Sequence, residues 1–390
     1  MKLKVLGIRH CDSSKLKFTW KSMTTFYSLI IVLVGIGLCC HYFIAIIIKE
    51  NGNPMDSLRR NFFILLPTLS IVISIRVARS WPTLIYQFER IERKMYTLSI
   101  KSHLPFKLKI YILLSILIYL SILTYFYVSV VSLIKTCDAL NPHMATVYGL
   151  QVVHLIKLNI ELPGVTWYAM SLAAICIVFP TIIIQVEGIL IILISITTQY
   201  FKQFNKKLEL VKFRKTSSYF WRNMRESYNE LSHLVITLDQ HLCILVFLVV
   251  SFSFGNTFFV LYMFLTYPDS KYVLFLLCIV LGKMGFFLVI MASVNYESKQ
   301  MLSVLYSVPN NSYNIEVERF IRQVHFQKVA ISGCRLFNID REFVVTVFES
   351  IITYTLIAFQ FGIVSDLKGR NNPSDLCIEV KKVFNDTLKS

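Results

Sequence analysis

Charged residues are scarce in this sequence, and their scarcity argues against a soluble protein. Asp, Glu, Lys and Arg make up only 16% of the 390 residues, whereas about a quarter of the residues of soluble domains are charged. Apolar side chains occupy 55% of the positions, and the mean hydropathy is +0.59. The apolar residues gather in runs long enough to cross a hydrocarbon core about 30 Å thick. The sequence therefore predicts a membrane protein.

Alternation at the strand period is also missing, so the membrane spans are predicted to be helices. The fold class is an all-α membrane protein with seven transmembrane helices. Pro67 and Pro180 lie inside two of the spans, where bundled membrane helices tolerate a kink. The predicted spans are Thr25–Ile48, Asn61–Val77, Ile110–Ile134, Thr166–Thr197, His241–Tyr267, Val273–Val294 and Phe343–Val364.

The basic residues predict the orientation of these spans. Most of the 40 Lys+Arg fall in the N-terminal tail and in the segments after the second, fourth and sixth spans, which lie on one side of the membrane. The positive-inside rule makes that side cytoplasmic, so the N-terminus is predicted to be cytoplasmic and the C-terminus extracellular. Basic loops beside an anionic leaflet explain the net charge of +17 without a nucleic acid partner.

The cytoplasmic segments are predicted to contain helices of their own. "TTQYFKQFNKKLELVKF" continues the fourth span without a proline or glycine. Apolar residues of "NIEVERFIRQVHFQKVAISG" recur near helical spacing; they are Ile315, Phe320, Ile321, Val324 and Val329. We expect these helices to pack into a cytoplasmic platform through aromatic residues, although an amphipathic helix lying on the membrane surface remains an alternative. The aromatics are Phe201, Phe204, Trp221 and Phe326.

The nine cysteines predict neither a metal site nor a cofactor, because they form no CxxC and no His/Cys cluster. In the predicted topology only Cys137 and Cys377 face the oxidising side, either as a disulfide or as two unpaired thiols. No set of His, Asp and Glu side chains converges within the membrane. The sequence therefore predicts that the protein is not an enzyme.

Ionisable residues inside membrane spans mark a pathway, a ligand site or a paired contact. Glu187 lies about 30 Å below the outer end of its span, at the inner boundary, and is interpreted as solvated or structural. Lys283 and Asn256 both lie about 20 Å from the short turn "YPDSKY", so they are expected to meet near the bilayer middle. Either they lock the hairpin of the fifth and sixth spans, or they face a water-filled pocket that accepts a ligand.

Aromatic residues in the outer halves of the spans are candidates to line such a pocket with rings and hydroxyls. Each of them is also explained as an aromatic of the membrane interface. These candidates are Tyr125, Tyr127, Trp167, Tyr168 and Tyr262.

The seventh span carries a polar stripe. At 100° per residue, one face of this helix collects Thr346, Glu349, Thr353, Ile357, Gln360 and Val364, with Phe361 beside it. Several copies of the helix around an axis would form a cation-permeable pore, in which Glu349 attracts cations, Gln360 offers its carbonyl and Phe361 blocks by dewetting. The alternative is hydrogen bonding between helices within one bundle. The residues leave both readings open.

The seventh span also resembles a known signature. "TYTLIAFQF", Thr353 to Phe361, resembles the TYhhhhhQF motif of insect gustatory receptors, and "GCRLFNIDREF" is similar to the segment that precedes it in that family. The resemblance implies a homotetrameric ligand-gated cation channel related to insect odorant receptors, opened by a small-molecule tastant. Gln360 and Phe361 would form the gate, and Thr353 and Tyr354 would brace the pore helix. Sugar receptors resemble TYE where this chain has Thr355, which argues weakly against that subgroup.

The resemblance also assigns roles to segments of the chain. Residues 1–24 would be a cytoplasmic tail, and residues 25–300 six spans with a ligand pocket in their outer half and long cytoplasmic extensions. Residues 301–342 would form a cytoplasmic anchor helix, residues 343–364 the pore-lining helix, and residues 365–390 an extracellular tail. The implied location is the plasma membrane of a sensory dendrite, in contact with lipid and permeant cations, with other gustatory receptor subunits as further partners.

Two other functions fit a multi-span membrane protein less well. A G-protein-coupled receptor also has seven spans, but it predicts the opposite charge bias, and its Asp-Arg-Tyr and Asn-Pro-x-x-Tyr motifs are absent at the expected positions. A transporter is disfavoured because the chain shows no internal repeat and no matching pair of broken spans.

Overall fold

The computed structural model describes residues 22–47, 54–95, 165–211, 214, 216–266 and 271–360, with 109, 110, 113, 114, 116, 117 and 120. Five long helices dominate the described part of the chain before the C-terminal region. They are α1 (Met23–Ile47), α2 (Pro54–Met95), α5 (Val165–Glu209), α6 (Ser218–Thr266) and α7 (Lys271–Gln300). The predicted third span falls mostly outside the described residues.

Short elements connect α7 to the last helix. They are α8 (Leu302–Tyr306), the 3₁₀ turn η2 (Asn310–Ser312), α9 (Ile315–Phe326), the strands β1 (Ser332–Gly333) and β2 (Phe337–Asn338), and finally α10 (Arg341–Gln360). The antiparallel two-residue strands are an exception to the predicted all-helical fold.

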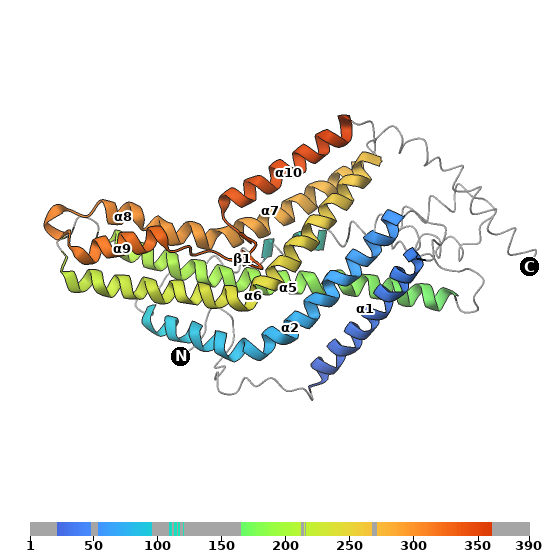
Figure 1. Cartoon of the computed structure of the whole chain (residues 1–390), viewed down its shortest axis with the longest axis horizontal. Helices are drawn as coiled ribbons and strands as arrows, with labels where there is room; N and C mark the ends of the chain where they lie inside the picture. Colours follow the sequence, from blue (N-terminus) through green and yellow to red (C-terminus); the bar gives the residue numbers. More distant parts are fainter. Residues whose placement is uncertain are drawn as a thin grey trace, which may run out of the picture.

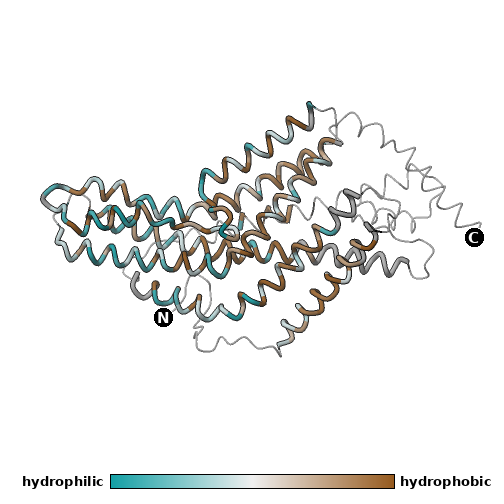
Figure 2. Tube along the Cα trace, viewed as in Figure 1, coloured by the Kyte–Doolittle hydropathy of each residue, from teal (hydrophilic) through white to brown (hydrophobic). Residues whose placement is uncertain are grey.

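The helices run together at one end of the molecule and diverge at the other. In Figure 1, α5, α6 and α7 lie beside α8 and α9 on the left, whereas α10 and α1 lie at opposite edges on the right. Hydropathy follows this division, because hydrophilic residues gather in the left part and hydrophobic residues dominate the diverging part (Figure 2). We call the two parts the hydrophilic end and the apolar half.

Among the described residues, four helical stretches have the length and composition to cross a membrane. They are Asn61–Ile91, Thr181–Glu209, Ser218–Leu265 and Val273–Tyr306, and a shorter apolar stretch covers Thr25–Cys40. The prediction of a helical membrane-type protein is therefore confirmed. The count of seven spans stays a prediction, as does their orientation.

The helix continuations beyond the predicted spans pack through aromatic rings at the hydrophilic end. Tyr228 of α6 lies between Phe204 of α5 and Phe320 of α9, with ring centroids 6.3 and 5.5 Å away. All three side chains are buried, and burial raises the pKa of Tyr228 to about 12. Asn314 begins α9 by accepting hydrogen bonds from the backbone N–H groups of Glu316 and Val317.

Two expectations for this region were wrong in detail. Phe201, Phe204 and Trp221 are buried as predicted, but Phe326 is 75% exposed. It is the last residue of α9 and lies beyond the buried face that Val317, Phe320 and Val324 form. Of the residues predicted at helical spacing, Ile315 is exposed, and Val329 is buried in extended chain after the helix.

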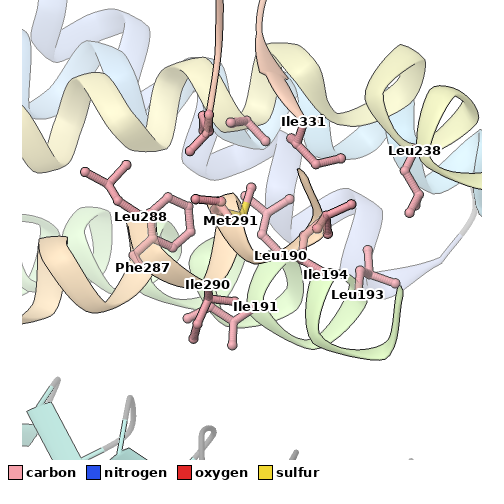
Figure 3. Close-up of a cluster of buried hydrophobic side chains, with 14 of the residues drawn as sticks. Leu190, Ile191, Leu193, Ile194, Leu238, Phe287, Leu288, Ile290, Met291 and Ile331 are labelled. Atoms are coloured by element: carbon pink, nitrogen blue, oxygen red, sulfur yellow. The ribbon is translucent and has the colours of Figure 1, made fainter. Parts of the chain in front are cut away.

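The core continues into the apolar half. Figure 3 shows Leu190, Ile191 and Ile194 of α5 facing Phe287 and Met291 of α7. These five side chains are no more than 1% exposed. Tight packing of this kind holds α5 and α7 in a fixed register.

Candidate functional site

The start of α10 is fixed by the β-hairpin that precedes it. Ser332 donates two hydrogen bonds to Asp239 Oδ1 of α6, from its backbone N–H at 2.6 Å and from its hydroxyl at 2.8 Å. Phe337 of β2 covers Gly333, where an added Cβ would approach the ring to 2.3 Å, and it stacks on Phe343 of α10 at 4.7 Å. The hairpin therefore joins the first turn of α10 to α6.

Two further contacts fix the first turn of α10. Asp340 accepts a 2.9 Å hydrogen bond from the backbone N–H of Phe343, which is a side-chain N-cap. The Arg341 guanidinium lies 3.3 Å above the ring of Tyr296 of α7. These contacts set the position from which the rest of α10 extends.

The polar stripe of α10 points away from the bundle of its own chain. Thr346, Glu349, Thr353, Ile357 and Gln360 are all exposed, whereas Val347 and Ile351 on the other side of the helix are buried. The Thr346 hydroxyl donates to the Glu342 carbonyl within the same helix. Phe361 and Val364 lie outside the described residues. Among the described residues no hydrogen bond joins the side chains of this stripe to another helix, and both readings of the stripe stay predictions.

The inner side of α10 contacts α6 and α7 at two specific points. Tyr354 meets Phe258 of α6 edge to face, with centroids 5.8 Å apart. Phe348 fits against Gly285 of α7, where an added Cβ would approach the ring to 2.9 Å. The two contacts connect α10 to the helices that carry Asn256 and Lys283.

Lys283 forms an ion pair with Glu187 of α5. Glu187 is 1% exposed and also accepts a 3.0 Å hydrogen bond from the Ser253 hydroxyl of α6. Of the two readings of Glu187, solvated or structural, the solvated one and the boundary position were wrong, because α6 and α7 cover the carboxylate. The expected meeting of Lys283 with Asn256 stays a prediction; the residues that follow each of them do meet, since Thr257 Oγ1 lies 3.5 Å from Met284 Sδ.

The charges in the sequence point to the Glu187–Lys283 pair, but the depth estimate for Glu187 did not use them. Two opposite charges inside separate predicted spans are each costly alone, so their partnership could have been proposed from charge alone. The depth estimate missed the pair because it counted residues along α5 alone. α5 is longer than its predicted span, and packing against neighbouring helices decides which of its residues meet those helices.

The predicted pocket aromatics do not come together in the described part of the chain. Tyr125 and Tyr127 lie outside the described residues, and so do the side chains of Trp167 and Tyr168. Tyr262 is half exposed on α6. The predicted outer pocket remains a proposal.

A different, apolar pocket of about 360 Å³ opens between α2, α5 and α6. Its lining includes Trp81 of α2, Val186 and Leu190 of α5, and Leu245 of α6. Leu245 lies near the middle of α6, about three turns before Asn256 of the predicted pocket. Val186 is adjacent in sequence to Glu187, but the predicted ligand residues whose side chains the structure describes, Asn256, Tyr262 and Lys283, do not line the pocket.

Comparison with known proteins relates the whole chain to chemosensory receptors. It is 26% identical over 382 residues to the gustatory receptor for sugar taste 64f of Drosophila melanogaster, covering 93% of this chain and 78% of that protein. It is 24% identical over 387 residues to the gustatory receptor for sugar taste 64a of the same species, covering 94% of this chain and 82% of that protein.

The fold is similar to that of a solved receptor. The structure of the insect olfactory receptor OR5 from Machilis hrabei in complex with eugenol aligns with a TM-score of 0.64 at 13% identity, over 87% of this chain and 91% of that one. At this identity the likeness concerns the fold alone.

The argument from Thr355 against the sugar-receptor subgroup was wrong. Thr355 donates a 2.7 Å hydrogen bond to the Ile351 carbonyl of its own helix, and this local bond carries no information about the ligand class. The profile of the family described as Trehalose receptor matches residues 2–370. The resemblance to gustatory receptors is thereby confirmed, and the chain belongs to the trehalose receptor family of insect gustatory receptors.

Proposed function

We propose that this protein is the subunit of a homotetrameric, ligand-gated cation channel that a small saccharide opens. In this proposal seven helices span the plasma membrane of a sensory neuron, with the N-terminus in the cytoplasm. Four copies of α10 surround the pore, and the hydrophilic end forms the cytoplasmic anchor. Other gustatory receptor subunits are further candidate partners.

The outward-facing polar stripe of α10 carries this proposal. A membrane helix that exposes Glu349, Thr353 and Gln360 needs water or a polar partner on that side. A symmetric ring of identical helices supplies both, because the stripes then face a common aqueous axis. Tyr354 and Phe348 make the contacts of α10 with α6 and α7, so the polar stripe can face such an axis.

A saccharide is the proposed tastant because the relatives that match most of the chain are named for sugar taste. Sugars are recognised by hydroxyl, amide and charged groups together with aromatic faces. Asn256 and Tyr262 of α6 remain the proposed contributors, whereas Lys283 of α7 is paired with Glu187. Tyr125, Tyr127, Trp167 and Tyr168 complete the proposed outer pocket.

Whole-cell current in insect cells expressing the chain tests the function. Mono- and disaccharides are applied one at a time, and cells expressing Phe361→Ala serve as the comparison. We expect an inward cation current to at least one sugar, and a larger basal or evoked current in the variant because the constriction is wider. The proposal is contradicted if protein that reaches the cell surface gives no current with any of the sugars and the Phe361→Ala variant gives no current either.

A further inference from the structure

The buried ion pair between Glu187 and Lys283 stands at a junction of three helices. Glu187 comes from α5, Lys283 from α7, and Ser253 of α6 donates the 3.0 Å hydrogen bond to the same carboxylate. The Glu187 side chain is 1% exposed and that of Lys283 is 14% exposed. The apolar half thus contains one compact charged contact that joins α5, α6 and α7.

Stability alone is a poor explanation for this contact. Removing two charges from water costs several kcal/mol per ion, and a well-packed apolar pair of similar volume is often as stable or more stable. Buried ionic groups are best attested where they fix a register or hold one of two states. Within a membrane, an ionisable group is also a functional-site candidate by default.

The position of the pair relative to α10 indicates which movement it controls. Lys283 lies two residues before Gly285, against which Phe348 of α10 packs. On α6, Ser253 lies five residues before Phe258, which contacts Tyr354 of α10. Both helices that contact α10 are therefore linked to α5 through the Glu187 carboxylate, close to where they contact the proposed pore helix.

We propose that the Glu187–Lys283 pair is a gating latch, which holds α6 and α7 against α5 in the resting channel. This inference rests on the proposed channel function and adds its regulation. Agonist binding must separate α7 from α5 enough to weaken the pair, and α10 follows α7 through the contact of Gly285 with Phe348. Both residues are positioning residues, because they act on the gate through other side chains.

A neutral pair tests the latch without leaving a buried charge. The double variant Glu187→Gln with Lys283→Met keeps both shapes and removes both charges, so its surface delivery should match the wild type. We expect the sugar concentration for half-maximal current to fall about tenfold and the basal current to rise, within the usual range of coupling between sites. Ser253→Ala should shift the same curve in the same direction by less.

An ion pair between two other helices provides the control. Arg90 of α2 and Glu230 of α6 are 3.5 Å apart. The double variant Arg90→Met with Glu230→Gln removes an ion pair that involves neither α7 nor α10. We expect its sugar response to match that of the wild type, because it leaves the described contacts of α10 with α6 and α7 unchanged.

Each outcome has one meaning. If the wild type conducts and the neutral pair has the same dose response as the wild type, the latch is overturned but the channel function stands. A right-shifted response with unchanged basal current assigns Lys283 to the ligand and also overturns the latch. If the neutral pair and the reversed pair Glu187→Lys with Lys283→Glu both fail to reach the surface, the contact serves folding alone. A wild type that never conducts refutes the proposed function itself.

Discussion

Phe258 of α6 and Tyr354 of α10 meet edge to face, with ring centroids 5.8 Å apart and an interplanar angle of 74°. Tyr354 is the tyrosine of the TYhhhhhQF motif, and the contact gives it a structural task on the inner side of α10. The motif therefore combines two faces of one helix. Tyr354 contacts Phe258 of the bundle although it is 58% exposed, while Thr353 and Gln360 lie on the polar stripe.

Removing this aromatic contact should change gating. An edge-to-face pair contributes about 0.5–1.5 kcal/mol beyond the area it buries. Tyr354→Leu and Phe258→Leu should each shift the half-maximal sugar concentration, by up to about tenfold. A double-mutant cycle of dose-response curves measures the coupling. Strictly additive shifts would show that the two rings do not act together.

Glu349 should determine how readily cations enter the proposed pore. Its carboxylate is exposed on the polar stripe of α10, so a tetramer would present four such charges around the axis. Glu349→Gln should lower single-channel conductance, and Glu349→Lys should lower it further and admit anions. Conductance and reversal potentials measure both effects. Glu342→Gln, at the first turn of the same helix, is the matched control, and an equal effect there would remove Glu349 from the pore.

Glu316 at the hydrophilic end should make stability depend on pH in acid. The hydrogen bond from Arg225, at 3.0 Å, is the main reason that the pKa of Glu316 is lowered from its ordinary value of 4.5. A lowered folded-state pKa adds stability that is complete above the ordinary pKa and is lost as pH falls through the folded-state value. The melting temperature of detergent-solubilised protein should therefore fall below pH 4.5, and Glu316→Gln should flatten that part of the curve.

A neighbouring pair supplies the control for this pH effect. Glu318 binds Arg322 at 3.0 Å on the exposed side of α9, where screening by solvent weakens ion pairs. Glu318→Gln should leave the acid dependence of the melting temperature close to that of the wild type. Equal flattening by the two variants would contradict the special role of the contact between α6 and α9.

The aromatic cluster at the hydrophilic end should dominate the stability of that region. Phe320→Ala removes a fully buried ring that packs against both Phe204 and Tyr228 and should cost about 3–5 kcal/mol. Phe326→Ala, in the same helix but 75% exposed, should cost no more than about 0.5 kcal/mol. Thermal unfolding followed by fluorescence measures both, and comparable losses would mean that Phe326 is covered in the assembly.

Glycosylation should report the orientation of the chain. "NDT" at Asn385 is an acceptor sequence in the tail that is proposed to be extracellular, whereas "NNS" at Asn310 lies at the opposite, cytoplasmic side of the proposed topology. An endoglycosidase shift that disappears with Asn385→Gln is the expected result in insect cells. A shift that instead depends on Asn310 would invert the proposed topology.

The sequence by itself determined that the protein is a helical membrane-type protein and to which family it belongs. Apolar runs, the positions of basic residues and the seventh-span motif are local properties, and local hydrophobicity decides which segments become membrane helices. The spacing around "YPDSKY" also predicted an antiparallel hairpin with Asn256 and Lys283 at equal depth, and the neighbouring Thr257 and Met284 do meet. The polar stripe of α10 followed from helical periodicity alone.

Only the tertiary structure decided which charges meet and which faces are covered. The partner of Lys283 proved to be Glu187, which is far away in the sequence, because α5 packs against α7 at a register that no local pattern encodes. Phe320 and Phe326 are chemically alike, yet Phe320 lies on the buried face of α9 and Phe326, the last residue of the helix, is exposed. Periodicity defines the faces of a helix, whereas packing between helices decides which face is buried.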